Sequence, residues 1–222
     1  KILIEESVRR LINLMNDDVK MGEMIDSKSW INAIVGLLAS GGSTNLCIHL
    51  LAMANAGGYK ILSEDIDELS KIIPIISNVY PNGTADVNQF HNSGGVAALI
   101  NYLLDEGMLF DDVFTVLGKG LDSYRKKISI TKDKIEWNEP ATSIDQSIIR
   151  DCKNPFRKSG GIKFIKGNIG SGLIKTSALK NSLSTIKGPA KVFNSQEEVI
   201  TAFENNNLNQ DCIIVVRGQG PS

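Results

Sequence analysis

The hydrophobic pattern of the chain changes character near Tyr124, and this change constrains the fold more than any other feature. Before it, apolar residues recur at the three- and four-residue spacing of helix faces, as in Val8, Leu11 and Met15. After it, short runs rich in Val, Ile and Phe alternate with glycine-containing turns, which is typical of strands. The sequence therefore predicts a mainly helical part followed by a β-rich part.

The spacing predicts helices over residues 8–15, 31–38, 46–56 and 96–106, and another helix that starts near residue 63 and that Pro74 limits. We expect Ser27 or Ser29 to cap the second of these, and Ser63 to cap the helix before Pro74. Residues 46–56 are apolar almost all round, which predicts a helix buried on most sides. A Gly-Gly pair precedes a buried helix twice, at residues 41–42 and 94–95.

Residues 126–142 are polar and rich in lysine, with Trp137 as the only bulky anchor, so we expect a linker there. Strands are predicted over residues 162–165, 173–178, 190–193 and 212–216, with one helix over 196–203 that Ser195 caps. We expect a partly closed β-barrel that is unfinished at Ser222. Because the chain opens at Lys1 within a sequence pattern typical of a helix, we also expect it to be a fragment of a longer protein.

The composition excludes several classes of protein. The 222 residues are 42% hydrophobic, carry a net charge of −1 with dispersed lysines and arginines, and contain no apolar run long enough to span a bilayer. We therefore expect a globular, soluble chain whose partners are small molecules or proteins, with no nucleic acid and no membrane. Cys47, Cys152 and Cys212 are odd in number and widely spaced, which favours reduced thiols in the cytoplasm over a disulfide framework. Convergence of the three thiols on a metal stays open.

Gly41-Gly42-Ser43-Thr44-Asn45 is the most informative local motif. Two glycines allow a ligand to approach the backbone, and the following hydroxyl and amide groups lie where a helix exposes free N–H groups, which suits a carboxylate or phosphate. An ordinary capped helix start is the alternative.

Three other features have simpler alternatives. Residues 167–172 are glycine-rich and precede Lys175, but without the Gly-Lys-Ser/Thr ending a tight turn is favoured over a phosphate loop. His49 is expected to be a core histidine. His91 lies in polar surroundings and is a better candidate for a functional role. The acidic residues 65, 67 and 68 are most simply a solvated helix face.

The amino-acid sequence resembles the dihydroxy-acid and sugar-acid dehydratase family. The matching motifs occur in the same order over nearly the whole chain. The blocks that carry the resemblance are residues 24–26, 30–38, 41–45, 49–50, 69–70, 80–83 with Asp86, 94–95, 118–121, 154–156, 167–168, 175–178, 189–190, 192–193 and 219–221. Tyr80-Pro81-Asn82-Gly83 and Gln219-Gly220-Pro221 favour the phosphogluconate branch. Asn88-Gln89-Phe90-His91 departs from that branch, and its Phe90-His91 looks like the dihydroxy-acid branch.

The resemblance implies an α/β multi-domain fold. Residues 1–125 would be the helical portion of the N-terminal domain, and residues 126–142 the linker that crosses to the next domain. Residues 143–222 would be the first part of a C-terminal β-barrel-like, swivelling domain. It also implies a hydro-lyase that converts 6-phospho-D-gluconate to 2-dehydro-3-deoxy-6-phospho-D-gluconate in the Entner–Doudoroff pathway. Such a reaction removes a weakly acidic C2 proton and expels hydroxide from C3.

In the family, a 4Fe-4S cluster with an open iron position binds the leaving hydroxyl, and Mg2+ holds the carboxylate end. The resemblance places the cluster cysteines and most Mg2+ ligands before Lys1, and a further acidic ligand and a serine base after Ser222. It therefore implies no catalytic residue and no metal ligand in this chain, which alone should be inactive. The substrate-binding candidates are Ser43, Thr44, Asn45, His91, Asn168 and Lys175.

The resemblance further implies a homodimer and a sugar-acid phosphate as the small-molecule ligand. Two alternatives stay open: a dihydroxy-acid or other sugar-acid dehydratase, and a non-catalytic fragment if the complete protein lacks the cluster cysteines.

Overall fold

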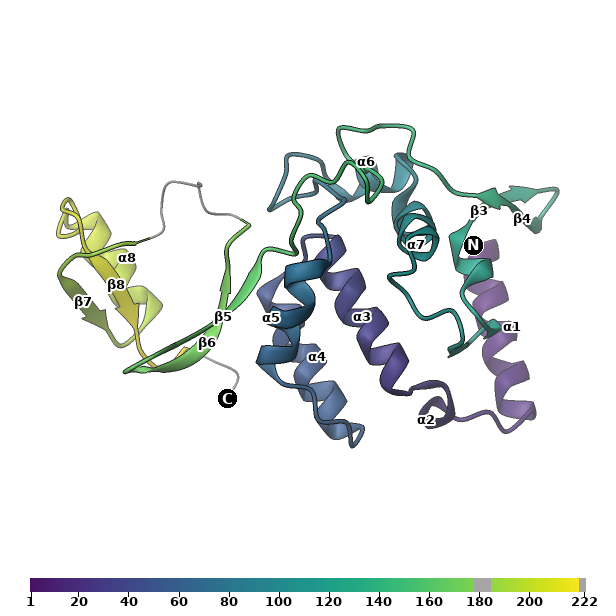
Figure 1. The fold of residues 1–222 in the computed structure, drawn as a ribbon, viewed down its shortest axis with the longest axis horizontal. Coiled ribbons are helices and arrows are strands. Elements are labelled where there is room, and N and C mark those ends of the chain that lie inside the picture. The colour runs from purple at the N-terminus through teal and green to yellow at the C-terminus, as the bar shows by residue number, and fades with distance from the viewer. Residues whose placement is uncertain (178–184, 220–222) are drawn as a thin grey trace. The chain divides into compact units, whose positions relative to one another are not determined.

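The chain divides into two units, Lys1–Ala178 and Leu179–Ser222, and the computed structural model describes residues 1–177 and 185–219 (Figure 1). The helices of the first unit are α1 (Ile2–Asn16), α2 (Met21–Met24), α3 (Ser27–Ala39), α4 (Thr44–Ala56), α5 (Ser63–Ile72), α6 (Val87–Asn92), α7 (Gly95–Asp105) and the short η1 (Asp122–Arg125). Its strands are β1 (Phe114–Thr115), β2 (Gly118–Lys119), β3 (Lys126–Thr131), β4 (Lys134–Pro140), β5 (Ile162–Gly167) and β6 (Gly170–Lys175). The second unit contains β7 (Ala190–Phe193), α8 (Gln196–Glu204) and β8 (Ile213–Val216).

Helix α3 is the centre of the first unit, with α4, α5 and α7 packed against it (Figure 1). Its Ile34 and Leu38 are almost completely buried, as are Ile66 of α5 and Leu103 of α7. The apolar spacing over residues 31–38 therefore predicted the core helix correctly. Burial of aliphatic side chains such as these contributes about 1.5–3 kcal/mol each.

The start of α3 is capped by Asp26, not by Ser27 or Ser29 as predicted. The Asp26 carboxylate accepts the Ser29 backbone N–H at 2.8 Å, and the Ser29 hydroxyl lies 2.8 Å from the same carboxylate oxygen. These hydrogen bonds hold the pKa of Asp26 below its usual value, the backbone bond being the largest cause. Aspartate and serine cap equally well, so composition did not separate them.

The ends of α5 and α7 show one wrong prediction and two confirmed ones. Ser63 is the first residue of α5 rather than its cap, and the Asp65 carboxylate accepts the Leu62 backbone N–H at 2.8 Å. The helix ends at Ile72, before Pro74, as expected. Helix α7 ends before Gly107, whose N–H donates to the last turn of the helix.

Helix α4 is not buried on most sides, so that prediction was wrong. Its buried residues are Cys47, Leu50 and Ala54, and its exposed apolar side chains include Leu46, Ile48 and Met53. His49 is also exposed, which contradicts the expected core histidine. Within the described part of the chain α4 packs mainly against α3 and β6, and neither reaches its outer face. No described helix has the length and apolar character needed to cross a membrane.

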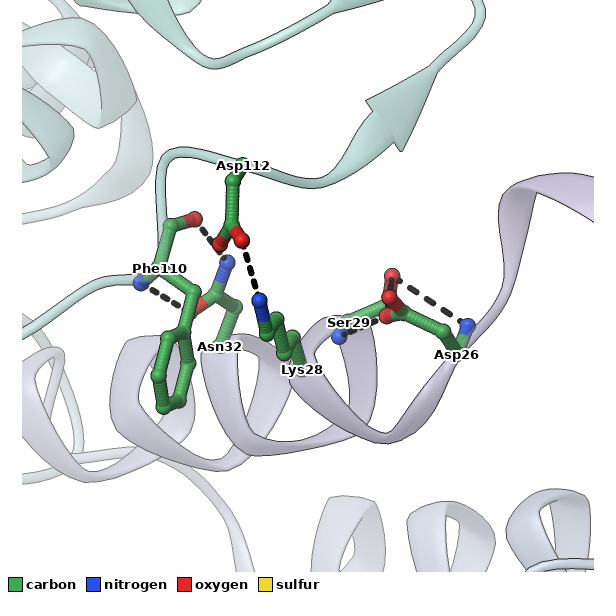
Figure 2. Close-up of polar contacts among 6 residues, drawn as sticks. All are labelled: Asp26, Lys28, Ser29, Asn32, Phe110 and Asp112. Carbon is green, nitrogen blue, oxygen red and sulfur yellow. Dashed lines mark hydrogen bonds and ion pairs between the residues drawn. The ribbon is translucent and has the colours of Figure 1, made fainter.

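Polar contacts fasten the start of α3 to the segment that follows α7 (Figure 2). The Asn32 side chain donates to the Phe110 carbonyl at 2.8 Å and accepts the Phe110 N–H at 2.9 Å. One turn earlier, the Lys28 ammonium pairs with Asp112 and lies 5.6 Å from the centre of the Phe110 ring. Its hydrogen bond keeps the pKa of the Asp112 carboxyl below the usual value. The loop after α7 is therefore held against α3.

The segment 126–142, predicted as a linker, carries the β3–β4 hairpin, in which Ile130 pairs with Ile135. The Trp137 side chain is 44% exposed and does not anchor the hairpin in the core. The predicted domain limits, 1–125, 126–142 and 143–222, stay predictions.

Strands β5 and β6 form a second antiparallel hairpin, with Gly167 opposite Gly170. The glycine-rich residues 167–172 thus make a tight hairpin turn, as the simpler interpretation predicted. The hairpin packs on α5 through buried Ile162, whose N–H donates to the Ser70 hydroxyl at 3.1 Å. The strand predicted over 173–178 lies earlier, at Gly170–Lys175, and Ala178 is outside the described residues.

In the second unit, β7 pairs in parallel with β8, and α8 makes the crossover between them. The Ser195 hydroxyl caps α8 by accepting the Glu198 N–H at 3.2 Å, as predicted. The described strands of the whole chain make separate two-stranded pairs. The partly closed barrel stays a prediction.

Candidate functional site

The predicted Gly41-Gly42 motif forms a tight turn between α3 and α4. Gly41 has a φ of +67°, which residues with a Cβ adopt at a cost, and its N–H donates to Leu38 O at 3.0 Å. A Cβ on Gly42 would overlap with Leu37, whose carbonyl accepts the Gly42 N–H at 2.8 Å. Both glycines are thus required by the geometry of the turn.

Helix α4 starts directly after this turn with Ser43 as its N-cap. The Ser43 hydroxyl oxygen accepts the Asn45 backbone N–H at 3.0 Å. Thr44 is half-buried and Asn45 is exposed, and neither side chain makes a hydrogen bond within the described residues. Their polar groups therefore stay available for a ligand.

The stretch after α5 brings Asn82 to the turn. Ile76 N–H donates to Ala39 O at 2.9 Å, and the Ser77 hydroxyl donates to Ser40 O at 2.9 Å. The chain then turns at residues 80–82. The Asn82 side-chain amide donates to the Gly41 carbonyl.

Lys175, at the end of β6, completes what we call the turn cluster: Gly41, Gly42, Asn82, Lys175 and Ser177. Its ammonium donates to both the Gly41 and the Gly42 carbonyl, each at 3.0 Å. Buried Ser177 donates from its hydroxyl to the Asn82 side-chain oxygen at 3.2 Å. Three segments far apart in sequence thus converge on one turn.

The turn cluster carries an uncompensated positive charge. Lys175 is half-buried, and no carboxylate pairs with it in the described part of the chain. Burial lowers the pKa of Lys175, with a smaller opposing effect from nearby Cys47. The N-terminal end of the α4 dipole, next to this turn, adds positive potential.

Of the predicted binding residues, the structure brings together Ser43, Thr44, Asn45 and Lys175. His91 is exposed on α6 and Asn168 is exposed in the β5–β6 turn, and no hydrogen bond joins either to the turn cluster among the residues described. Sequence reasoning missed Asn82 and Ser177. Both lie within motif blocks, at 80–83 and 175–178, and that was the available signal.

The three cysteines are free thiols. Cys47 and Cys152 lie in the first unit and Cys212 in the second. Burial raises the pKa of the Cys47 thiol, and that of Cys152 to about 11. Over residues 1–177 and 185–219, no three His, Cys, Asp or Glu side chains are grouped to hold a metal ion such as Mg2+.

Comparison with protein families gives two matches that together cover most of the chain. Residues 1–124 match the family described as dihydroxy-acid/6-phosphogluconate dehydratase N-terminal, and residues 147–222 match its C-terminal counterpart. The candidate site draws on both, because Gly41 and Asn82 lie in the first match and Lys175 in the second.

Curated relatives agree with these matches. The chain is 44% identical to a phosphogluconate dehydratase of Rhizobium meliloti (strain 1021) over 99% of its length, and 43% identical to that of Escherichia coli (strain K12) over 96%. A dihydroxy-acid dehydratase of Metallosphaera sedula is 35% identical over 98% of the chain. The chain spans 37%, 36% and 37% of these relatives, respectively, or just over a third of their length.

Proposed function

This chain belongs to the dihydroxy-acid/6-phosphogluconate dehydratase family, and we propose that the complete protein removes water from 6-phospho-D-gluconate. The product is 2-dehydro-3-deoxy-6-phospho-D-gluconate, which makes the protein a hydro-lyase of the Entner–Doudoroff pathway. The observation that carries this proposal is the higher identity to relatives named phosphogluconate dehydratase, 44% and 43%, than to the dihydroxy-acid dehydratase, 35%.

One local feature favours the second candidate, a dihydroxy-acid dehydratase. Phe90-His91 departs from the pattern of the phosphogluconate branch, and His91 is exposed on α6. The turn cluster does not include His91, so this departure weighs less than the identity over the whole chain.

In this proposal the start of α4 forms part of the wall of the substrate cleft. The Thr44 hydroxyl and the Asn45 amide are open for hydrogen bonds to the hydroxyl groups of the sugar acid. The N-terminal end of the α4 dipole and the Lys175 ammonium favour an anionic group of the substrate, such as the carboxylate.

The remaining parts of the site belong to the rest of the proposed protein. As the resemblance implies, the cluster and Mg2+ would be held by residues outside this chain. The isolated chain is accordingly proposed to be inactive. We extend the proposal to an α/β fold with a C-terminal barrel-like domain, to a homodimer and, because the three cysteines are unpaired, to the cytoplasm.

The experiment is an anaerobic assay of the complete, iron-reconstituted protein for 2-keto acid formation. The substrates are 6-phosphogluconate, 2,3-dihydroxyisovalerate and unphosphorylated gluconate, each supplied alone. Turnover of 6-phosphogluconate supports the proposal, and absence of keto acid from all three refutes it.

The contribution of the α4 start is tested by Thr44→Ala and Asn45→Ala in the same protein. Each should lower kcat/KM at least about tenfold, equivalent to about 1.4 kcal/mol of transition-state binding. Asn55→Ala is the matched control, because Asn55 is exposed at the other end of α4. Unchanged kinetics in the first two variants would refute a role of these two side chains in substrate binding.

A further inference from the structure

The Lys175 ammonium has contacts that a residue serving only to bind substrate would not need. Two of its three N–H donors are directed at consecutive backbone carbonyls, those of Gly41 and Gly42, both at 3.0 Å. The lysine and the glycines are more than 130 positions apart in sequence. The contact therefore joins the end of β6 to the turn that starts α4.

Apart from Lys175, few hydrogen-bond donors reach the carbonyls of this turn among the described residues. Residue 41 has left-handed backbone geometry, and its carbonyl receives one other side-chain donor, from Asn82. Asn82 is itself oriented by the hydroxyl of Ser177, two residues after Lys175. The end of β6 and the residues that follow it thus hold the turn both directly and through Asn82.

From this arrangement we propose that Lys175 is a positioning residue. Its ammonium fastens the Gly41-Gly42 turn to β6 and thereby sets the direction of the Ser43–Asn45 groups at the start of α4. The inference rests on the proposed function for its catalytic consequence, but the fastening itself is a property of the protein without substrate.

The fastening is tested by hydrogen exchange of the complete protein in the absence of substrate. Lys175→Met keeps the aliphatic stem and removes the donors, so amides of residues 41–47 should exchange about tenfold faster. Lys166→Met is the matched control, since Lys166 is exposed on the same hairpin and has no polar partner within the described residues. Lys175→Arg, which keeps the charge and several donors, should restore part of the protection.

A second variant keeps the inference testable if Lys175→Met does not fold. Asn82→Ala removes the other donor to Gly41 and should also accelerate exchange in residues 41–47. Unchanged exchange in the folded lysine variant, or in Asn82→Ala if the lysine variant does not fold, overturns the inference.

Activity then tests the catalytic consequence. Lys175→Met should lower kcat for 6-phosphogluconate at least tenfold, with partial recovery in Lys175→Arg. A variant with faster exchange in residues 41–47 but wild-type kcat would overturn the positioning role. Inactive wild-type protein would instead refute the proposed function, so the two failures are distinguishable.

Discussion

The substitution Gly41→Ala tests the geometry of the turn most sharply. At a φ of +67°, a residue with a Cβ pays about 1–2 kcal/mol. The new Cβ would also overlap with the Asn82 amide, which then loses its hydrogen bonds to Gly41 and Ser177, about 1 kcal/mol each. The free energy of unfolding should therefore fall by about 3–4 kcal/mol.

Gly36→Ala is the matched control on the preceding helix. Gly36 lies inside α3, and a Cβ there would meet no atom within 4 Å. Alanine should therefore stabilise the helix by about 0.5–1 kcal/mol.

Urea unfolding of this chain, followed by the fluorescence of buried Trp30 in a Trp137→Phe background, measures both changes. A loss below about 0.5 kcal/mol for Gly41→Ala would refute the reasoning, since that is smaller than the backbone cost alone. The reasoning would also be refuted if the Gly36→Ala variant were less stable than the Gly41→Ala variant.

Two further predictions concern the start of α3. Asn32→Ala removes both hydrogen bonds to Phe110 and should cost about 1–2 kcal/mol in the same unfolding experiment, whereas a loss below 0.3 kcal/mol would show that water replaces them fully. Asp26→Asn should flatten the acid side of the pH–stability curve. Because the folded pKa of Asp26 is lowered, its charged form contributes stability above its ordinary pKa of 3.8, and this is lost as the pH falls through the folded value. Identical curves for wild type and Asp26→Asn between about pH 5 and 2 would contradict this assignment.

The sequence predicted the elements well where local spacing determines them. The apolar spacing of residues 31–38 identified α3, and Ser195 was correctly predicted to cap α8. The glycines at 41–42 marked the turn because the left-handed backbone of Gly41 and the close approach of Leu37 to Gly42 are local requirements. These signals depend on neighbours a few residues away.

Long-range contacts could not be predicted in this way. The outer face of α4 also carries apolar side chains, among them Leu46, Ile48 and Met53, so its composition did not show that only one side is covered. Asn82 and Ser177 meet across 95 positions, and neither belongs to a local pattern that indicates a partner. Lys175 was selected through the family resemblance, but its contact with the glycine turn came only from the structure.

The central claim is the preference for a phosphorylated sugar acid, and competition between substrates tests it most directly. The complete, iron-reconstituted protein would receive equal concentrations of 6-phosphogluconate and 2,3-dihydroxyisovalerate in one anaerobic reaction. We predict that 2-dehydro-3-deoxy-6-phosphogluconate forms at least about tenfold faster than the competing keto acid, a difference of about 1.4 kcal/mol in transition-state binding. Faster conversion of dihydroxyisovalerate would contradict the claim and assign the protein to the dihydroxy-acid branch.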